Sequence, residues 1–93
     1  MRYKIIYKPF PEPLRGIVRA LTSLQGNLYT ILIDALLDDS ERKEAIKHEL
    51  SHIVLGHFLD DQRSVEELEA EADAHAAAMT EDELIRLMGR MAI

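Results

Sequence analysis

The sequence predicts an α+β fold in which a small sheet packs on helices, and three observations support this class. Segments 3–8 and 28–34 are short and rich in β-branched and aromatic residues, which is typical of strands. Several other segments carry apolar residues at helical spacing, and some of these begin with residues that cap helices. The length of 93 residues suits one domain, which we expect to span residues 1–93.

The N-terminal third is predicted to contain a strand, a helix and a second strand. The first strand, 3–8, ends before a proline-rich turn. Segment 14–24 is predicted to be a helix, because its apolar residues recur at helical spacing with arginines on the other side. These apolar residues are Leu14, Ile17, Val18, Leu21 and Leu24. Segment 28–34 carries apolar side chains on both faces, which indicates a buried strand.

Three further helices are predicted in the rest of the chain. The first should run from about 40 to 58 and follows the capping residues DDS. Ser64 and Glu67 have the spacing of a capping box and should begin a helix that ends near Ala78. A similar signal, TEDE at 80–83, should begin the last helix. The predicted order is therefore β-α-β-α-α-α.

The composition restricts the class of function. A net charge of −6 argues against nucleic acid as the main partner. The absence of cysteine excludes disulfides, thiolate metal sites and a cysteine nucleophile. No apolar run approaches the roughly 18 residues of a membrane span, and the N-terminus lacks the apolar stretch of a signal peptide. We therefore expect a cytoplasmic protein that does not bind membranes.

The segment HELSH at 48–52 has the form H-E-x-x-H. His48 and His52 are one helical turn apart, so both imidazoles can bind one Zn²⁺ ion. Glu49 lies beside them, where its carboxylate can act as the general base for a metal-activated water. On a helical wheel the two histidines lie among apolar residues, where unpaired imidazoles would be costly. The pattern therefore favours a metal site over two surface histidines.

A third protein ligand has to come from outside this motif. His57 follows His52 by five residues, which is a rotation of about 140° around a helix. Unless the helix breaks at Gly56, His57 faces away from the metal, so we expect it to be packed or hydrogen-bonded near the helix end. His75 sits at an apolar position on its wheel and is predicted to be a packed histidine.

The acidic helix predicted after Ser64 supplies better candidates. A short connection implies an antiparallel hairpin, which brings Glu69 level with His52. The wheel places Glu69 beside the inward apolar stripe, and Asp73 lies one turn further along. Glu69 is therefore the predicted third ligand, and Asp73 the predicted hydrogen-bond partner of a metal-bound imidazole. Glu71 borders the stripe on its other side and is the alternative ligand.

Over residues 26–79 the sequence resembles the ImmA/IrrE family of zincin metallopeptidases. The shared elements are an apolar strand, an H-E-x-x-H helix with an L-G-H-type ending and a later E-x-E-A-D segment. The last segment is also similar to gluzincins, which implies that Glu69 is the ligand and Asp73 orients a histidine. The resemblance implies a minimal zincin-like domain that cleaves a protein, commonly a helix-turn-helix repressor, and hence a role in transcription regulation.

We therefore expect an endopeptidase in which Zn²⁺ is the cofactor and Glu49 is the base. An extended substrate segment is expected to pair with strand 28–34. The alternative is a non-catalytic module that keeps the metal for stability and binds a regulatory protein without cleaving it. The presence of Glu49 favours the enzyme, because a structural zinc site needs no base. The oligomeric state is left open.

Overall fold

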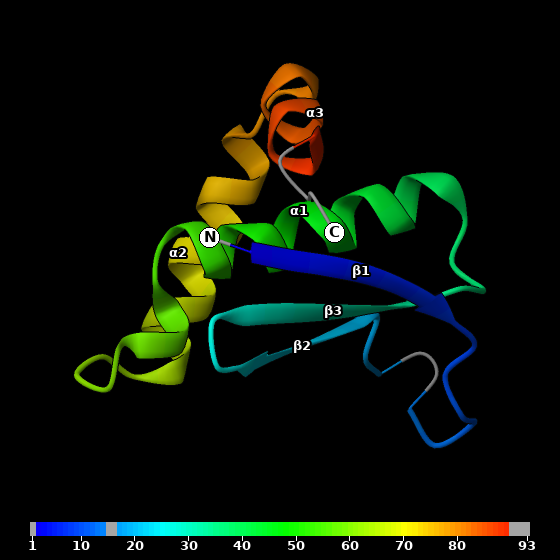
Figure 1. Ribbon diagram of the computed structural model, residues 1–93, viewed down its shortest axis with the longest axis horizontal. Helices are drawn as coiled ribbons and strands as arrows, with labels where there is room; N and C mark the ends of the chain where they lie inside the picture. The colour runs from blue at the N-terminus through cyan, green and yellow to red at the C-terminus, as the bar shows by residue number, and fades with distance from the viewer. Residues whose placement is uncertain (1, 15–16, 90–93) are drawn as a thin grey trace.

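The computed structural model describes residues 2–14 and 17–89 (Figure 1). In these residues a three-stranded sheet is followed by the helices α1, α2 and α3, with one short 3₁₀ helix, η1, between α1 and α2. The α+β class is as predicted, but the predicted order β-α-β-α-α-α is wrong, because the strands come first. Figure 1 shows α1 running along the sheet and α2 crossing near the C-terminal end of α1.

The sheet is mixed, with the strand order β1-β3-β2. β3 (Leu28–Asp34) is central, parallel to β1 (Arg2–Lys8) and antiparallel to β2 (Ala20–Gln25). Ile31 and Ile33 of β3 are fully buried, as expected for a central strand. The expected pairing of a substrate with this strand is wrong, because both edges of β3 already pair with neighbouring strands.

The helix predicted over 14–24 is not present in the part of this segment that the structure describes. Residues 15 and 16 lie outside that part, and the last five residues of the segment belong to β2. Exposure in β2 alternates residue by residue, with Leu21 exposed and Leu24 packed against the core. Leucines three residues apart fit a helical pattern, but the hydrogen bonds to β3 impose the strand period instead.

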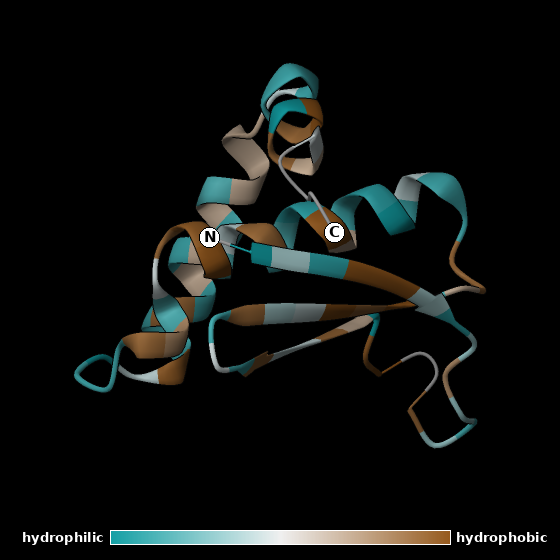
Figure 2. Cartoon of the chain, viewed as in Figure 1, coloured by the Kyte–Doolittle hydropathy of each residue, from teal (hydrophilic) through white to brown (hydrophobic). Residues whose placement is uncertain are grey.

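Helix α1 (Asp39–Val54) begins at a complete capping box. The Asp38 carboxylate accepts from the Glu41 backbone N–H at 2.8 Å, and the Glu41 carboxylate accepts from the Asp38 N–H at 3.2 Å. One face of the helix packs on the sheet and is apolar. Its buried residues include Ala45, Ile46, Leu50 and Ile53. Figure 2 shows that the first turns of α1 are hydrophilic and that apolar residues recur along the rest of the helix.

Helix α1 ends at Val54, short of the predicted boundary at residue 58. The cause is Gly56, whose φ of 73° is left-handed and stops the helical rotation. The 3₁₀ helix η1 (His57–Leu59) follows at once. His57 therefore does not take the orientation that an unbroken helix would give it.

Helix α2 (Val65–Ala78) begins at the predicted capping box of Ser64 and Glu67. Ala72 and Ala76 are buried on α2, where small side chains permit close packing against α1. Helix α3 (Glu81–Gly89) begins after Thr80, whose hydroxyl accepts from a backbone N–H in the first turn. Within the described part of the chain, no helix is long and apolar enough to cross a membrane.

Replacement of Gly56 by alanine should destabilise the fold by about 1–2 kcal/mol, because a Cβ is strained in the left-handed region. Space is not the limit, since an added Cβ would meet no described atom within 4 Å. Gly89→Ala is the matched control, because Gly89 is helical, equally open and not left-handed. Urea denaturation measures both variants. Equal free energies of unfolding for the two would contradict the role given to Gly56.

Candidate metal centre

The two motif histidines and a glutamate from α2 meet at one point between the helices. His48 and His52 have their Nε2 atoms 3.1 Å apart. Glu69 places Oε2 3.0 Å from His48 Nε2 and Oε1 3.1 Å from His52 Nε2. A tetrahedral ion with bonds of 2.0–2.1 Å holds its ligand atoms about 3.3 Å apart. The residues present therefore fit a metal ion with two imidazole ligands and one carboxylate ligand.

Asp73 lies one helical turn after Glu69 and contacts the other nitrogen of His48. Its Oδ1 is 3.0 Å from His48 Nδ1. An ionised carboxylate can only accept a hydrogen bond, so Asp73 can accept from Nδ1 of His48 when Nε2 of the ring binds a metal ion. The structure thus places Asp73 where the helical wheel predicts a partner for a metal-bound imidazole.

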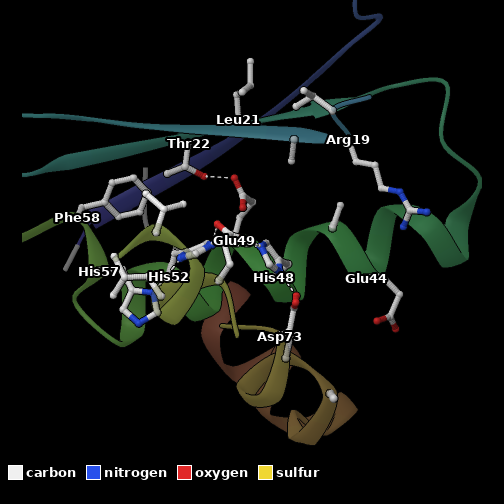
Figure 3. Close-up of a pocket in the computed structure, with 18 of the residues that line it drawn as sticks. Arg19, Leu21, Thr22, Glu44, His48, Glu49, His52, His57, Phe58 and Asp73 are labelled. Carbon is white, nitrogen blue, oxygen red and sulfur yellow. Dashed lines mark hydrogen bonds and ion pairs between the residues drawn. The ribbon is translucent and has the colours of Figure 1, made fainter. Parts of the chain in front are cut away.

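Glu49 points away from α2, toward β2 (Figure 3). Its Oε1 accepts a hydrogen bond of 2.9 Å from the hydroxyl of Thr22. Potential ligand atoms of His48, Glu49 and His52 all lie within 4.8 Å of one another, so these three residues can hold a metal ion. The two oxygens of Glu69 contact both Nε2 atoms, whereas the carboxylate of Glu49 is hydrogen-bonded to Thr22 of β2.

Thr22 was missed by sequence reasoning because the helix assigned to 14–24 gave it no role. The segment ALTSLQ at 20–25 does not alternate between apolar and polar residues, so the pattern itself carries no clear strand signal. Read with period two, Thr22 shares a face with Ala20 and Leu24, which are partly buried. This face of β2 is turned toward α1, since the Thr22 hydroxyl donates to Glu49 of α1.

His57 is turned back toward the motif rather than away from it. The turn at Gly56 places His57 Nδ1 2.9 Å from His52 Nδ1. His57 is only 6% exposed, and its Nε2 lies 2.7 Å from Oε1 of Glu71. The expectation of a hydrogen-bonded histidine at the helix end is confirmed, but the orientation expected for an unbroken helix is wrong.

Glu71, the alternative ligand, contacts His57 and Arg63. Arg63 donates from Nη1 to Oε2 at 2.8 Å and from Nη2 to Oε1 at 3.3 Å. Hydrogen bonds from Arg63 and then His57 lower the pKa of Glu71 to about 2. Asp60 accepts a hydrogen bond from Arg63 Nε at 2.8 Å, and hydrogen bonds from Arg63 and Gln62 lower the pKa of Asp60 to about 2. The carboxylates of Glu71 and Asp60 in turn raise the pKa of Arg63. These contacts favour Glu69 over Glu71 as the third ligand.

The surroundings of His52 lower the pKa of its imidazole. Burial lowers the pKa of His52, and the nearby His48 ring adds to this effect, while the carboxylate of Glu69 opposes it. Only a neutral imidazole has a lone pair for a metal ion. The burial of His52 therefore suits the role of a ligand.

His75 lies outside this cluster. Its Nδ1 is 2.8 Å from Oγ of Ser51, and the Ser51 hydroxyl donates to the carbonyl of Lys47 at 2.8 Å. Because the only hydroxyl hydrogen is used in that bond, His75 donates to Ser51. The contact joins α2 to α1 and agrees with the prediction of a packed histidine.

An open groove of about 780 Å³ runs over the motif (Figure 3). It is lined by β2, by the segment before it, and by α1, η1 and α2. Several apolar side chains on its wall are exposed, with Val65 at 74% and Phe58 at 38%. A groove of this shape and lining can take a polypeptide segment with apolar side chains.

A family model described as the IrrE N-terminal-like domain, from a peptidase family, matches residues 3–91. No curated protein and no solved structure matches the chain significantly. The match spans nearly the whole sequence and includes the H-E-x-x-H motif, Glu69 and Asp73. Together with the cluster of metal-binding groups, it shows that this chain belongs to the ImmA/IrrE family of metallopeptidases.

Proposed function

We propose that the protein is a zinc-dependent endopeptidase with His48, His52 and Glu69 as ligands and Glu49 as general base. Membership of a metallopeptidase family supports the reaction class. The observation that carries the assignment of roles is the separation of the two glutamates. Glu69 contacts both imidazoles, whereas Glu49 is held on the opposite side by Thr22.

Zinc suits this set of donor groups. Two imidazoles and one carboxylate leave a fourth position open, which is the arrangement of catalytic rather than structural zinc sites. When bound, zinc would polarise the scissile carbonyl and lower the pKa of a water molecule. The burial of His52 and the contact of Asp73 with His48 keep both ring lone pairs available for the ion.

Glu49 would carry the proton during hydrolysis. Its carboxylate removes a proton from the attacking water and returns it to the nitrogen of the leaving amine. The hydroxyl of Thr22 occupies Oε1, so that Oε2 is left for the proton. Thr22 therefore orients the base without competing for the oxygen that reacts.

An extended substrate segment would pair with β2. This strand is at an edge of the sheet and lines the groove through Ala20 and Thr22. On its other side it pairs with no strand among the described residues, so its edge can form main-chain hydrogen bonds with a peptide. Phe58 and Val65 would contact the apolar side chains of that peptide.

The substrate we propose is a regulatory protein of the helix-turn-helix repressor type. The support is the likeness to the ImmA/IrrE family, whose members commonly cleave such repressors. The exposed apolar lining of the groove is compatible with a protein substrate. An enzyme of this specificity would act on transcription in the cytoplasm.

Protein purified without chelator should contain about one zinc ion per chain, and Glu69→Ala should lose most of it, because one of three ligands is removed. Glu66→Ala is the control, since Glu66 is exposed in the first turn of the same helix. Elemental analysis after dialysis gives the zinc content. Wild-type zinc content in the Glu69 variant would contradict its role as ligand.

Glu49→Gln should decrease kcat by about 10²–10⁴-fold with zinc retained, because the base is lost and the ligands are not. Thr22→Val should give a smaller decrease in kcat, because the carboxylate remains but loses its fixed orientation. Thr30→Val, on β3 and outside the groove lining, is the matched control. Fragments of a repressor encoded beside the protein, quantified by mass spectrometry, report the rate.

Two outcomes would change the proposal. Undiminished cleavage by Glu49→Gln would exclude Glu49 as the base. Binding of the repressor without cleavage by the wild-type protein or any variant would favour the non-catalytic module.

A further inference from the structure

His57 is buried and links the metal centre to two partly exposed polar side chains, Glu71 and Arg63, that the proposed reaction does not use. The ring lies between His52 and Glu71, with contacts of 2.9 Å at Nδ1 and 2.7 Å at Nε2. Its side chain is only 3% exposed, so water is not available as a substitute partner for either nitrogen. Each ring nitrogen must therefore be satisfied by the residue it contacts.

The contact with Glu71 fixes which nitrogen of His57 carries the hydrogen. The two oxygens of Glu71 accept from Arg63 at 2.8 and 3.3 Å, and a carboxylate paired in this way is ionised and only accepts. The hydrogen in the contact with His57 therefore belongs to Nε2. A neutral imidazole has one N–H, so Nδ1 of His57 keeps a lone pair.

The same reasoning continues to the ligand. The Nδ1 atoms of His57 and His52 are 2.9 Å apart, which is the distance of one hydrogen bond. Since Nδ1 of His57 is the acceptor, Nδ1 of His52 is the donor. His52 Nε2 is then free of hydrogen and faces His48 Nε2 at 3.1 Å and Glu69 at 3.1 Å.

The two ligand histidines are therefore oriented in different ways. His48 has a direct carboxylate partner, Asp73, which is largely exposed. His52 has its carboxylate one ring away, through a buried histidine. In both arrangements the Nδ1–H group faces a protein acceptor, and the Nε2 lone pair is directed toward the proposed metal position.

We propose that His57, together with Glu71 and Arg63, forms a relay that positions His52 as a metal ligand. The relay fixes the tautomer of His52 and the rotation of its ring. This proposal rests on the metal centre of the proposed function and not on peptide cleavage. The relay also depends on Gly56, because its left-handed turn directs His57 back toward His52.

The test is zinc affinity, measured by competition with a chromophoric chelator. Glu71→Gln should weaken zinc binding by about 10–100-fold, because an amide can donate to His57 Nε2 and reverse the direction of both hydrogen bonds. Glu66→Gln makes the same change of charge on the same helix and should keep wild-type affinity. Glu71 is 41% exposed, so its replacement should not prevent folding.

Substitutions of His57 test the ring itself. His57→Leu removes both hydrogen bonds and should weaken zinc binding at least as much as Glu71→Gln. His57→Gln should recover part of the affinity, because its carbonyl can accept from His52 and its amide can donate to Glu71. A role in packing alone would predict no advantage of glutamine over leucine. Circular dichroism without zinc checks that each variant is folded.

NMR gives a readout that is independent of affinity. Long-range ¹H–¹⁵N spectra of the zinc-loaded wild-type protein should show hydrogen on Nδ1 of His52 and on Nε2 of His57. Hydrogen on Nδ1 of His57, or unchanged zinc affinity in both Glu71→Gln and His57→Leu, would overturn the relay. A wild-type protein without zinc affinity would overturn the metal centre and the relay together. Zinc binding with the expected variant effects but no peptide cleavage would overturn the peptidase alone.

Discussion

The rotation of α1 about its own axis is the constraint on which the rest of the site depends. Leu50 is completely buried, and its neighbours Glu49 and Ser51 lie to either side of the line of contact with the sheet. With that face fixed, Glu49 reaches β2, while His48 and His52 reach α2. The packing of the core therefore also determines the geometry of the site. A rotation of α1 would separate Glu49 from Thr22, and His48 and His52 from Glu69, at the same time.

The parts of the site on regular helices could be predicted from the sequence. Spacing alone placed His48 and His52 on one face, and the capping box fixed the phase of α2 well enough to put Glu69 and Asp73 near them. The α+β class was equally accessible. Helical spacing predicts which side chains share a face as long as the backbone stays helical, and it does so throughout α1 and α2.

The failures have two physical causes. In β2 the leucines fit two periods, and only pairing with β3, which is not local in sequence, decides between them. Because the segment was predicted to be a helix, the contact of Thr22 with Glu49 was not foreseen. At the end of α1, the positive φ of Gly56 changes the direction of the chain, so a helical wheel of α1 does not predict the orientation of the His57 side chain. Outside the motif, His57 contacts Glu71 of α2, and Glu71 in turn accepts from Arg63 of the preceding loop. No pattern within the motif specifies these contacts.

The position of β2 at the edge of the sheet has a consequence for selectivity. The strand proposed to bind the peptide backbone also carries the Thr22 hydroxyl, which donates to Glu49, the proposed base. Edge strands with one unpaired side open more readily than central ones, and a peptide added to the free side would suppress that opening. Recognition and reactivity are then thermodynamically coupled. If Glu49 is the base, a ligand that fills the groove without extending along β2 would bind while leaving Glu49 poorly ordered. Discrimination between substrates would then be expressed in turnover more than in affinity.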